Sequence, residues 1–138
     1  MRRPRLIIGV IGNDIHVVAN RILARGLRQF GYEVCNLGVS VPPVDFVQAA
    51  IEYEADAVVV SSINGEGEGW VGEFRQIFRA VKRESILLYI GGNLAVGDQS
   101  PLKVEQRYRD IGFDRAYHRP SSLDILIEDL SVDLKHVR

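Results

Sequence analysis

The feature that most constrains the fold is a fivefold alternation of short apolar runs with stretches of helical periodicity. Runs that are apolar on both faces and rich in β-branched residues are typical of buried parallel strands. The expected strands are 6–11, 32–37, 57–61, 86–90 and 115–117. The expected helices are 17–30, a stretch that follows Pro42-Pro43 and ends at 53, then 70–82, 101–111 and 122–135.

Strands that alternate with helices through short links predict parallel pairing, because right-handed crossover helices then cover both faces of the sheet. Five such units favour an α/β fold, a flavodoxin-like (Rossmann-like) three-layer sandwich whose five-stranded parallel sheet has the order 2-1-3-4-5. The run 57–61 is apolar throughout and indicates a central strand, whereas the short run 115–117 indicates an edge strand. Residues 1–138 are expected to form one domain, because no linker, repeat or low-complexity stretch interrupts the pattern.

Composition narrows the classes of function. The formal net charge of −1 gives no reason to expect a nucleic-acid partner or binding to an anionic membrane. The first apolar run is too short for a signal peptide or a membrane span, so a cytoplasmic location is expected. Cys35 is the only cysteine, which excludes an internal disulfide and a thiolate metal cluster. We expect it to be an inert, buried strand residue.

Three loops expected at the carboxyl edge of the sheet carry residue types that a ligand site needs. They follow the first, third and fourth strands and comprise 13–16, 61–69 and 91–93. Ligands of open parallel sheets bind at this edge. Glycines let a ligand approach the backbone closely, and Ser61 and Ser62 offer hydroxyls. His16 offers an imidazole to a metal, and Asp14 is close enough in sequence to hold its other ring nitrogen.

Each of these signals also has an ordinary structural explanation. A loop histidine is usually solvated, Asp14 suits a helix cap, and Gly91-Gly92 suits a turn. Glu66 and Glu68 are typical of a solvated loop, and their negative charges disfavour phosphate binding at the neighbouring glycines. Neither a Gly-x-x-x-x-Gly-Lys-Ser/Thr motif nor a Gly-x-Gly-x-x-Gly motif opens the first helix. The placement of three such loops at one edge favours a ligand site over three unrelated turns.

The motif Asp14-x-His16-x-x-Ala19, followed by Ser61-x-Ile63 and Gly91-Gly92, resembles a cobalamin-binding signature. That signature is Asp-x-His-x-x-Gly, Ser-x-Leu and Gly-Gly. Over nearly the whole chain the similarity is to the small subunits of glutamate mutase (methylaspartate mutase), a cobalamin-binding family. The segments that carry the resemblance are 9–16, 20–23, 36–39, 60–62, 91–97, 104–108 and 112–115.

The resemblance implies a role for individual residues. His16 would be the axial cobalt ligand in place of the cofactor's own dimethylbenzimidazole base, and Asp14 would bond the other ring nitrogen of His16. Ser61 would hydrogen-bond the detached base, and Gly91 and Gly92 would let the nucleotide tail pass close to the backbone. The implied cofactor-binding set is Asn13, Asp14, Ile15, His16, Val17, Ala19, Ser61, Ile63, Gly65, Gly91, Gly92 and Asn93.

The resemblance also implies a function that is shared with a second subunit. The chain would carry adenosylcobalamin for a glutamate mutase that interconverts L-glutamate and threo-3-methylaspartate through radicals, and it would be inactive alone. A large, glutamate-binding barrel subunit would cover the cofactor, in a heterotetramer of two small and two large subunits. No catalytic residue is expected in this chain, and neither nucleic acid nor a membrane is expected as a partner.

Three departures from the family pattern leave alternatives open. Ala19 replaces the motif glycine, Ile63 replaces leucine, and Asn64 stands where an aromatic residue is typical. One alternative is a corrinoid protein of a methyltransferase system, although such proteins usually carry an extra helical bundle. Another is a degenerate cobalamin-fold protein, and a third is a receiver-like regulatory protein. A receiver would need an acidic phosphoacceptor after the third strand, where this chain has Ser61-Ser62.

Overall fold

A computed structural model describes residues 3–11, 17–62, 74–81, 85–95, 97, 99–119 and 122–137. In this part of the chain, five parallel strands form one sheet in the order β2-β1-β3-β4-β5. The strands are β1 (Arg5–Val10), β2 (Glu33–Asn36), β3 (Ala57–Ser62), β4 (Leu87–Gly92) and β5 (Arg115–His118). Strand order and pairing confirm the expected flavodoxin-like topology, with β3 at the centre and β5 at an edge.

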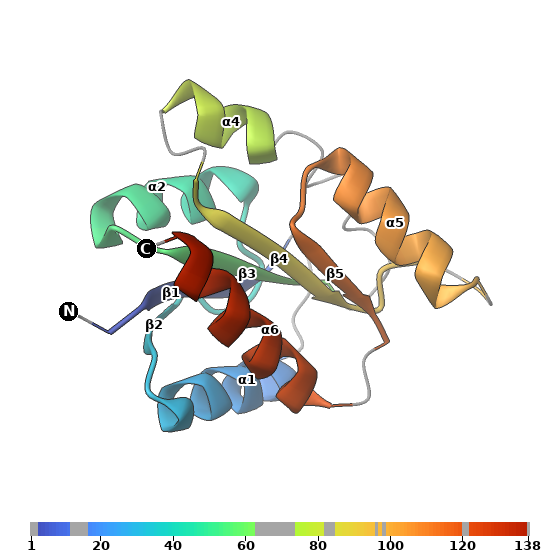
Figure 1. Cartoon of the computed structure of the whole chain (residues 1–138), viewed down its shortest axis with the longest axis horizontal. Helices are drawn as coiled ribbons and strands as arrows, with labels where there is room; N and C mark the ends of the chain where they lie inside the picture. Colours follow the sequence, from blue (N-terminus) through green and yellow to red (C-terminus); the bar gives the residue numbers. More distant parts are fainter. Residues whose placement is uncertain are drawn as a thin grey trace.

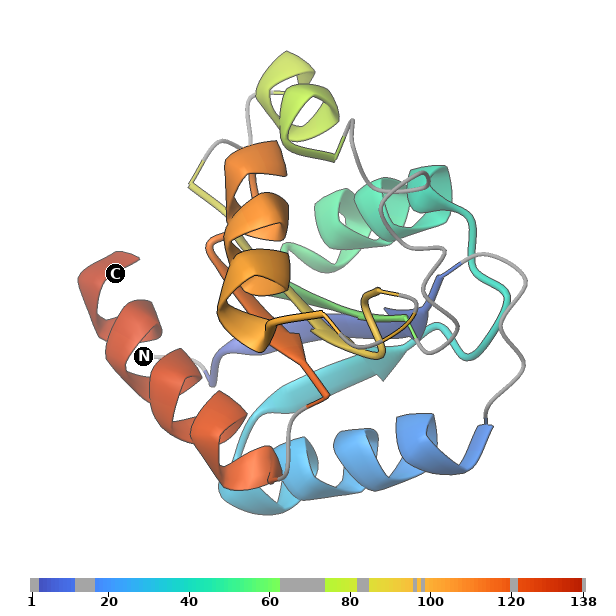
Figure 2. The same cartoon turned by 90° about the vertical axis from the view of Figure 1, so that its right-hand side faces the viewer.

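Helices cover both faces of the sheet and make three layers (Figures 1 and 2). One face carries α1 (Val17–Phe30) and α6 (Leu123–Val137). The other carries α2 (Pro43–Tyr53), α4 (Phe74–Ala80) and α5 (Pro101–Ile111). The prolines that open α2 and α5 fit the first helical turn, where the missing N–H would have no partner within the helix.

The two helical layers bury separate hydrophobic clusters, one on each face of the sheet. Along β1, Leu6 and Ile8 pack in the cluster that contains Leu27 of α1 and Leu130 of α6. Ile7 points to the opposite face, into the cluster that contains Phe46 of α2. Successive strand side chains alternate between the faces, so a strand that is covered on both sides must be apolar at every position. Burial of both faces of these strands therefore explains the continuous apolar runs of the sequence.

Some details differ from the sequence-based expectations. Cys35 is half-buried rather than buried, because β2 is an edge strand and all four of its residues are half-buried. Val81 follows the last residue of α4 and is exposed, although its spacing groups it with Phe74 and Phe78. The expected start of that helix at residue 70 lies outside the described residues. None of the described helices is long and apolar enough to cross a membrane.

Candidate functional site

The carboxyl ends of four strands line up in one row. Ser61 of β3 pairs with Val10 of β1 on one side and with Gly91 of β4 on the other. Gly91 in turn pairs with Tyr117 of β5. The backbone N–H of Ile11, just beyond β1, donates to the Ser61 carbonyl oxygen at 2.9 Å. The strand ends that carry the three expected loops therefore meet at one edge, as the sequence predicts.

A cavity of about 350 Å³ lies at this edge, on the face that carries α1 and α6. Its lining comes from five elements and from Ser122, just before α6. It comprises Ala19, Ile22, Leu23, Val59, Val60, Ser61, Tyr89, Ile90, Gly91, Gly92, Tyr117, Ser122, Leu123 and Leu126. Four of these residues, Ala19, Ser61, Gly91 and Gly92, belong to the expected cofactor-binding set. The structure thus brings together parts of three sequence motifs.

The chemistry of the lining suits a largely apolar group with one polar contact. Aliphatic side chains of α1 and α6 form two walls, and the rings of Tyr89 and Tyr117 add aromatic surface. Ser122 uses its hydroxyl to accept the backbone N–H of Asp124 at 3.1 Å, at the start of α6. The hydroxyl of Ser61 is the polar group that the end of β3 contributes to the lining. Sites of this size and composition bind small molecules with aromatic parts.

The cavity also explains apolar residues that the core does not bury. Ile22 is 61% exposed although it shares the apolar periodicity of α1, and it lines the cavity. Leu123 and Leu126 are half-buried, whereas Leu130 and Leu134 of the same helix face are buried. The amino-terminal part of α6 therefore lines the cavity, with Leu126 also packed against the core, and its carboxyl-terminal part faces the hydrophobic core.

The two adjacent glycines at the end of β4 have different structural roles. Gly92 has a φ of +126°, and a Cβ there would lie 2.1 Å from the carbonyl oxygen of Ser62. Only glycine fits that backbone position without rearrangement. A Cβ on Gly91 would meet Tyr117 at an ordinary 3.7 Å. Backbone geometry therefore does not require glycine at position 91, where the missing side chain keeps the cavity open.

Asn93 lies beside the site rather than in the cavity lining. Its Oδ1 accepts a hydrogen bond from Nε of Arg119 at 3.1 Å. The same arginine donates its backbone N–H to the Gly92 carbonyl oxygen at 2.8 Å and a guanidinium N–H to the Gly97 carbonyl oxygen at 3.0 Å. Arg119 has a φ of 51°, which is uncommon for a residue with a side chain. The hydrogen bonds of Arg119 thus connect the segment that follows β4 to the end of β5.

Six of the expected site residues belong to segments that the structure does not describe. Asn13, Asp14, Ile15, His16, Ile63 and Gly65 lie outside the described residues, and Val17 begins α1. Among the residues that are described, no group of three or more His, Cys, Asp or Glu side chains could hold a metal ion. The expected axial ligand, His16, is not among them.

Sequence reasoning missed the aromatic and α6 parts of the lining. Tyr89 lies two positions before Gly91 and so faces the same side of the sheet. Tyr117 is the register partner of Gly91. The alternation along β4 gives a signal for Tyr89 once Gly91 is in the site. The α6 residues give no such signal, because their spacing is that of an ordinary core-facing helix.

Comparison with known proteins gives the family. Residues 4–114 match the family model described as the B12 binding domain. The glutamate mutase sigma subunit of Clostridium tetani is 43% identical over 134 residues, which cover 97% of this chain and 98% of that protein. The chain belongs to the glutamate mutase sigma subunit family.

Solved structures that resemble this sigma-family chain show how widely its fold is used. A cobalamin-binding protein from Desulfitobacterium hafniense has a TM-score of 0.75 at 19% identity, over 95% of this chain and 59% of that one. The signal receiver domain of the response regulator NarL from Mycobacterium tuberculosis has a TM-score of 0.63 at 13% identity, with both chains fully covered. At these identities the likeness concerns the fold alone. Sequence similarity, rather than shape, separates the sigma family from receivers.

Proposed function

We propose that this chain binds cobalamin as the small subunit of a glutamate mutase and presents it to a separate catalytic subunit. The observation that carries the proposal is the cavity at the carboxyl edge, where Ala19, Ser61 and Gly91 meet. These residues come from the three motifs that resemble the cobalamin-binding signature. The family model and the sigma-subunit relatives support the same function.

The described residues fit the nucleotide tail of the cofactor. An apolar cavity of about 350 Å³ can take an aromatic base, and the Ser61 hydroxyl can donate a hydrogen bond to a ring nitrogen of that base. At Gly91 no side chain obstructs the passage of the tail. The methyl group of Ala19 belongs to an exposed residue at the cavity wall, so it is not wedged into packed core. We propose on this ground that Ala19 is compatible with binding.

For the cobalt end of the site we propose His16 as the axial ligand and Asp14 as its hydrogen-bonding partner. Position 16 directly precedes α1, whose residues Ala19 and Leu23 line the cavity. A carboxylate that accepts one ring N–H of a ligating histidine fixes the tautomer and raises the basicity of the other nitrogen. The remaining proposed contacts are Asn13, Ile15, Val17, Ile63, Gly65, Gly92 and Asn93.

The reaction requires a second subunit. When bound, adenosylcobalamin supplies the radical chemistry that interconverts L-glutamate and threo-3-methylaspartate. Among the residues that the structure describes, the lining of the cavity contains no charged side chain that could pair with the carboxylates of an amino acid substrate. We propose that glutamate binds to a large barrel-shaped subunit, in a cytoplasmic heterotetramer of two small and two large subunits.

Absorption spectroscopy tests cofactor binding. The purified chain is titrated with hydroxocobalamin and with adenosylcobalamin, alone and with the large subunit. The expected absorption spectrum is that of cobalamin with a nitrogen ligand on cobalt, and labelling the protein's histidines with ¹⁵N is expected to reveal splitting by a histidine nitrogen in the electron spin resonance of the cob(II)alamin form. His16→Ala is expected to weaken binding and abolish that splitting, whereas Glu128→Gln, an exposed change on α6, leaves both unchanged. Absence of binding even with the large subunit contradicts the proposal.

An activity assay tests the reaction. Formation of 3-methylaspartate from glutamate is expected only when this chain, a large subunit and adenosylcobalamin are all present. Methyl transfer from methylcobalamin, without any rearrangement of glutamate, would instead favour a corrinoid protein of a methyltransferase system. Activity in the complete absence of adenosylcobalamin would contradict the radical route.

A further inference from the structure

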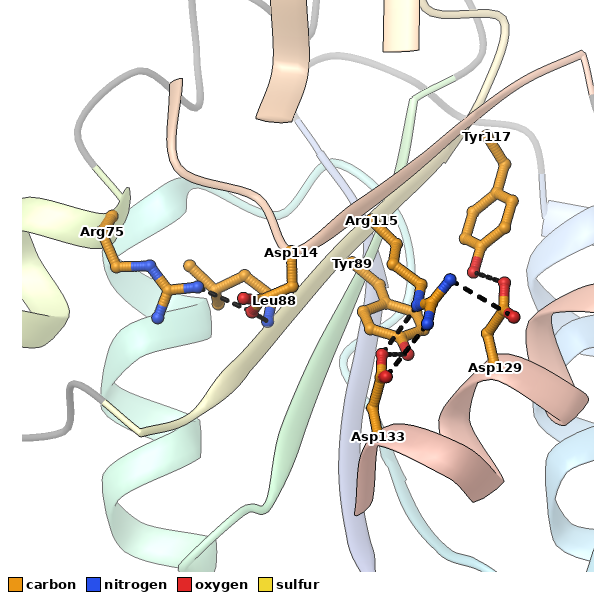
Figure 3. Close-up of polar contacts among 8 residues, drawn as sticks. All are labelled: Arg75, Leu88, Tyr89, Asp114, Arg115, Tyr117, Asp129 and Asp133. Carbon is orange, nitrogen blue, oxygen red and sulfur yellow. Dashed lines mark hydrogen bonds and ion pairs between the residues drawn. The ribbon is translucent and has the colours of Figure 1, made fainter. Parts of the chain in front are cut away.

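A polar cluster lies beside the cavity and joins α6 to β4 and β5 (Figure 3). The hydroxyl of Tyr89 donates a hydrogen bond to Asp133. The hydroxyl of Tyr117 donates one to Oδ2 of Asp129 at 2.7 Å. Both aspartates belong to α6 and both tyrosines to the sheet, so the two hydrogen bonds connect the helix to neighbouring strands.

Arg115 of β5 holds the two aspartates together. Its Nε and one terminal nitrogen donate to the two carboxylate oxygens of Asp133 at 2.7 and 3.0 Å. Its other terminal nitrogen lies 3.3 Å from Oδ1 of Asp129. Asp129 and Asp133 are four residues apart and so face the same side of the helix, where their charges would otherwise repel. We call Arg115, Asp129 and Asp133 the Arg-Asp cluster.

The two tyrosines of this network also line the cavity. Tyr89 is fully buried, and the two ring centroids are 6.1 Å apart with an angle of 53° between the ring planes. Burial, and then the hydrogen bond to the aspartate, raises the pKa of each tyrosine, so both hydroxyls remain protonated donors. Because its hydroxyl is engaged by α6, the ring of the half-buried Tyr117 is the part of that residue that is available to a ligand, and the buried Tyr89 ring supports it from beneath.

The helix that carries the aspartates is itself a wall of the cavity. Leu126 lies one turn before Asp129, and Leu123 lies one turn earlier still. A shift of α6 relative to β5 would therefore move the leucine wall relative to the two tyrosine rings. Asp129 and Asp133 oppose that shift with contacts to three side chains of the sheet, Tyr89, Arg115 and Tyr117.

We propose that the Arg-Asp cluster positions Tyr89, Tyr117 and the amino-terminal half of α6, so that the cavity is shaped for the nucleotide tail before the cofactor binds. The inference rests on the proposed function and adds residues that touch no cofactor. A cavity shaped in advance binds more tightly, because fewer side chains must be ordered when the ligand arrives.

The test compares cobalamin with cobinamide, which has the corrin but lacks the nucleotide tail. Tyr117→Phe, Asp129→Ala and the double variant are titrated with both ligands. Each single variant is expected to bind cobalamin about fivefold to tenfold more weakly, the size of one lost hydrogen bond. Cobinamide affinity is expected to stay within about twofold of wild type, because it does not use the tail cavity. The double variant should be no weaker than a single one, because both changes break the same contact.

Glu128→Gln is the matched control, since it removes a negative charge from an exposed position of the same helix. A loss with Tyr117→Phe but none with Asp129→Ala would mean that the hydroxyl acts on the ligand directly, and would overturn the positioning role. Equal loss of both ligands, or lower thermal stability with unchanged affinities, would show that the cluster serves stability alone. Should Asp129→Ala fail to fold, Arg115→Lys replaces it with the same expected pattern. Failure of the wild type to bind cobalamin would instead overturn the proposed function, and the inference with it.

Discussion

At the scale of single residues, Gly91 and Gly92 differ in the reason for their glycine. The backbone conformation requires it at position 92, whereas the proposed ligand requires it at position 91. Gly92→Ala would place a methyl group 2.1 Å from a backbone oxygen, at a φ that side chains disfavour. We expect it to lower the free energy of unfolding by about 2–3 kcal/mol. Gly91→Ala meets only an ordinary contact, so stability should stay level or rise by about 0.5 kcal/mol. Urea unfolding measures both changes.

The same pair gives a binding prediction. Gly91→Ala adds a methyl group to the cavity, so cobalamin affinity is expected to fall about tenfold or more, as overpacking implies. Cobinamide affinity should not change, because cobinamide carries no tail. Spectroscopic titration of both ligands gives the answer. Unchanged cobalamin affinity in Gly91→Ala would exclude passage of the tail beside this residue.

His118 makes a prediction about pH. The side chain is buried, and its Nδ1 accepts the backbone N–H of Leu94 at 3.1 Å. The neutral ring therefore carries its proton on Nε2, which has no hydrogen-bond partner among the residues described. Burial, followed by the positive charge of Arg119, lowers the pKa of His118, while Glu105 acts in the opposite direction.

The sign of the effect follows from proton uptake. Below a pH of about 6.5 the unfolded chain binds a proton at this histidine before the folded chain does, so acidification favours unfolding. We expect wild type to lose more stability than His118→Asn as the pH falls from the unfolded pKa toward the lower folded one. The asparagine oxygen can still accept the Leu94 N–H. Parallel urea unfolding curves at several pH values measure the difference, and equal pH dependence would contradict the assignment.

At the scale of secondary-structure elements, Arg75 of α4 fixes the amino ends of β4 and β5, away from the cavity (Figure 3). It donates to the carbonyl oxygens of Gly112 and Ile86 at 3.0 and 2.9 Å and to Asp114 at 2.7 Å. Arg75→Met should therefore lower the free energy of unfolding by about 2–4 kcal/mol. Cobalamin affinity well below the melting temperature should not change. Arg79→Met, at an exposed position of the same helix, is the control, and a comparable loss there would contradict this reading.

The elements also show what sequence patterns can predict. Both faces of a central parallel strand are buried, so runs such as 57–61 identify their strands and, through alternation with helices, the sheet order. Apolar spacing does not, however, predict which residues line the cavity. Leu123 and Leu126 have the helical spacing of Leu130 and Leu134, and only the tertiary arrangement decides which of them cover core and which line a cavity.

The polar residues show the same limit. Ser61 and Gly91 were identified because they stand at strand ends, where chain order alone places them at the ligand edge. The Arg-Asp cluster joins residues of β5 and α6 by long side chains, and nothing in their local sequence distinguishes these aspartates from the exposed acids of the same helix. For His16 and Asp14 the sequence remains the only source of the assignment.

At the scale of the whole molecule, ligand binding and folding are linked. A ligand that binds only the folded chain stabilises it by about 2.7 kcal/mol at a hundred times its dissociation constant, which raises the melting temperature of a domain of this size by about 9 °C. We expect cobalamin to give such a shift and cobinamide at the same concentration a smaller one. The difference reports the contribution of the tail cavity.

Two variants then show which part of the molecule produces the difference between the melting-temperature shifts of the two ligands. Gly91→Ala should bring the cobalamin shift down to the cobinamide shift, because its change lies in the tail cavity. Arg75→Met should start from a lower melting temperature and still show the full difference between the two ligands, because its change lies at the opposite end of the sheet. Equal shifts for the two ligands in wild type would mean that the tail gains nothing from the cavity. The cofactor would then be held by its cobalt end alone, and the cavity between α1 and α6 would need another occupant.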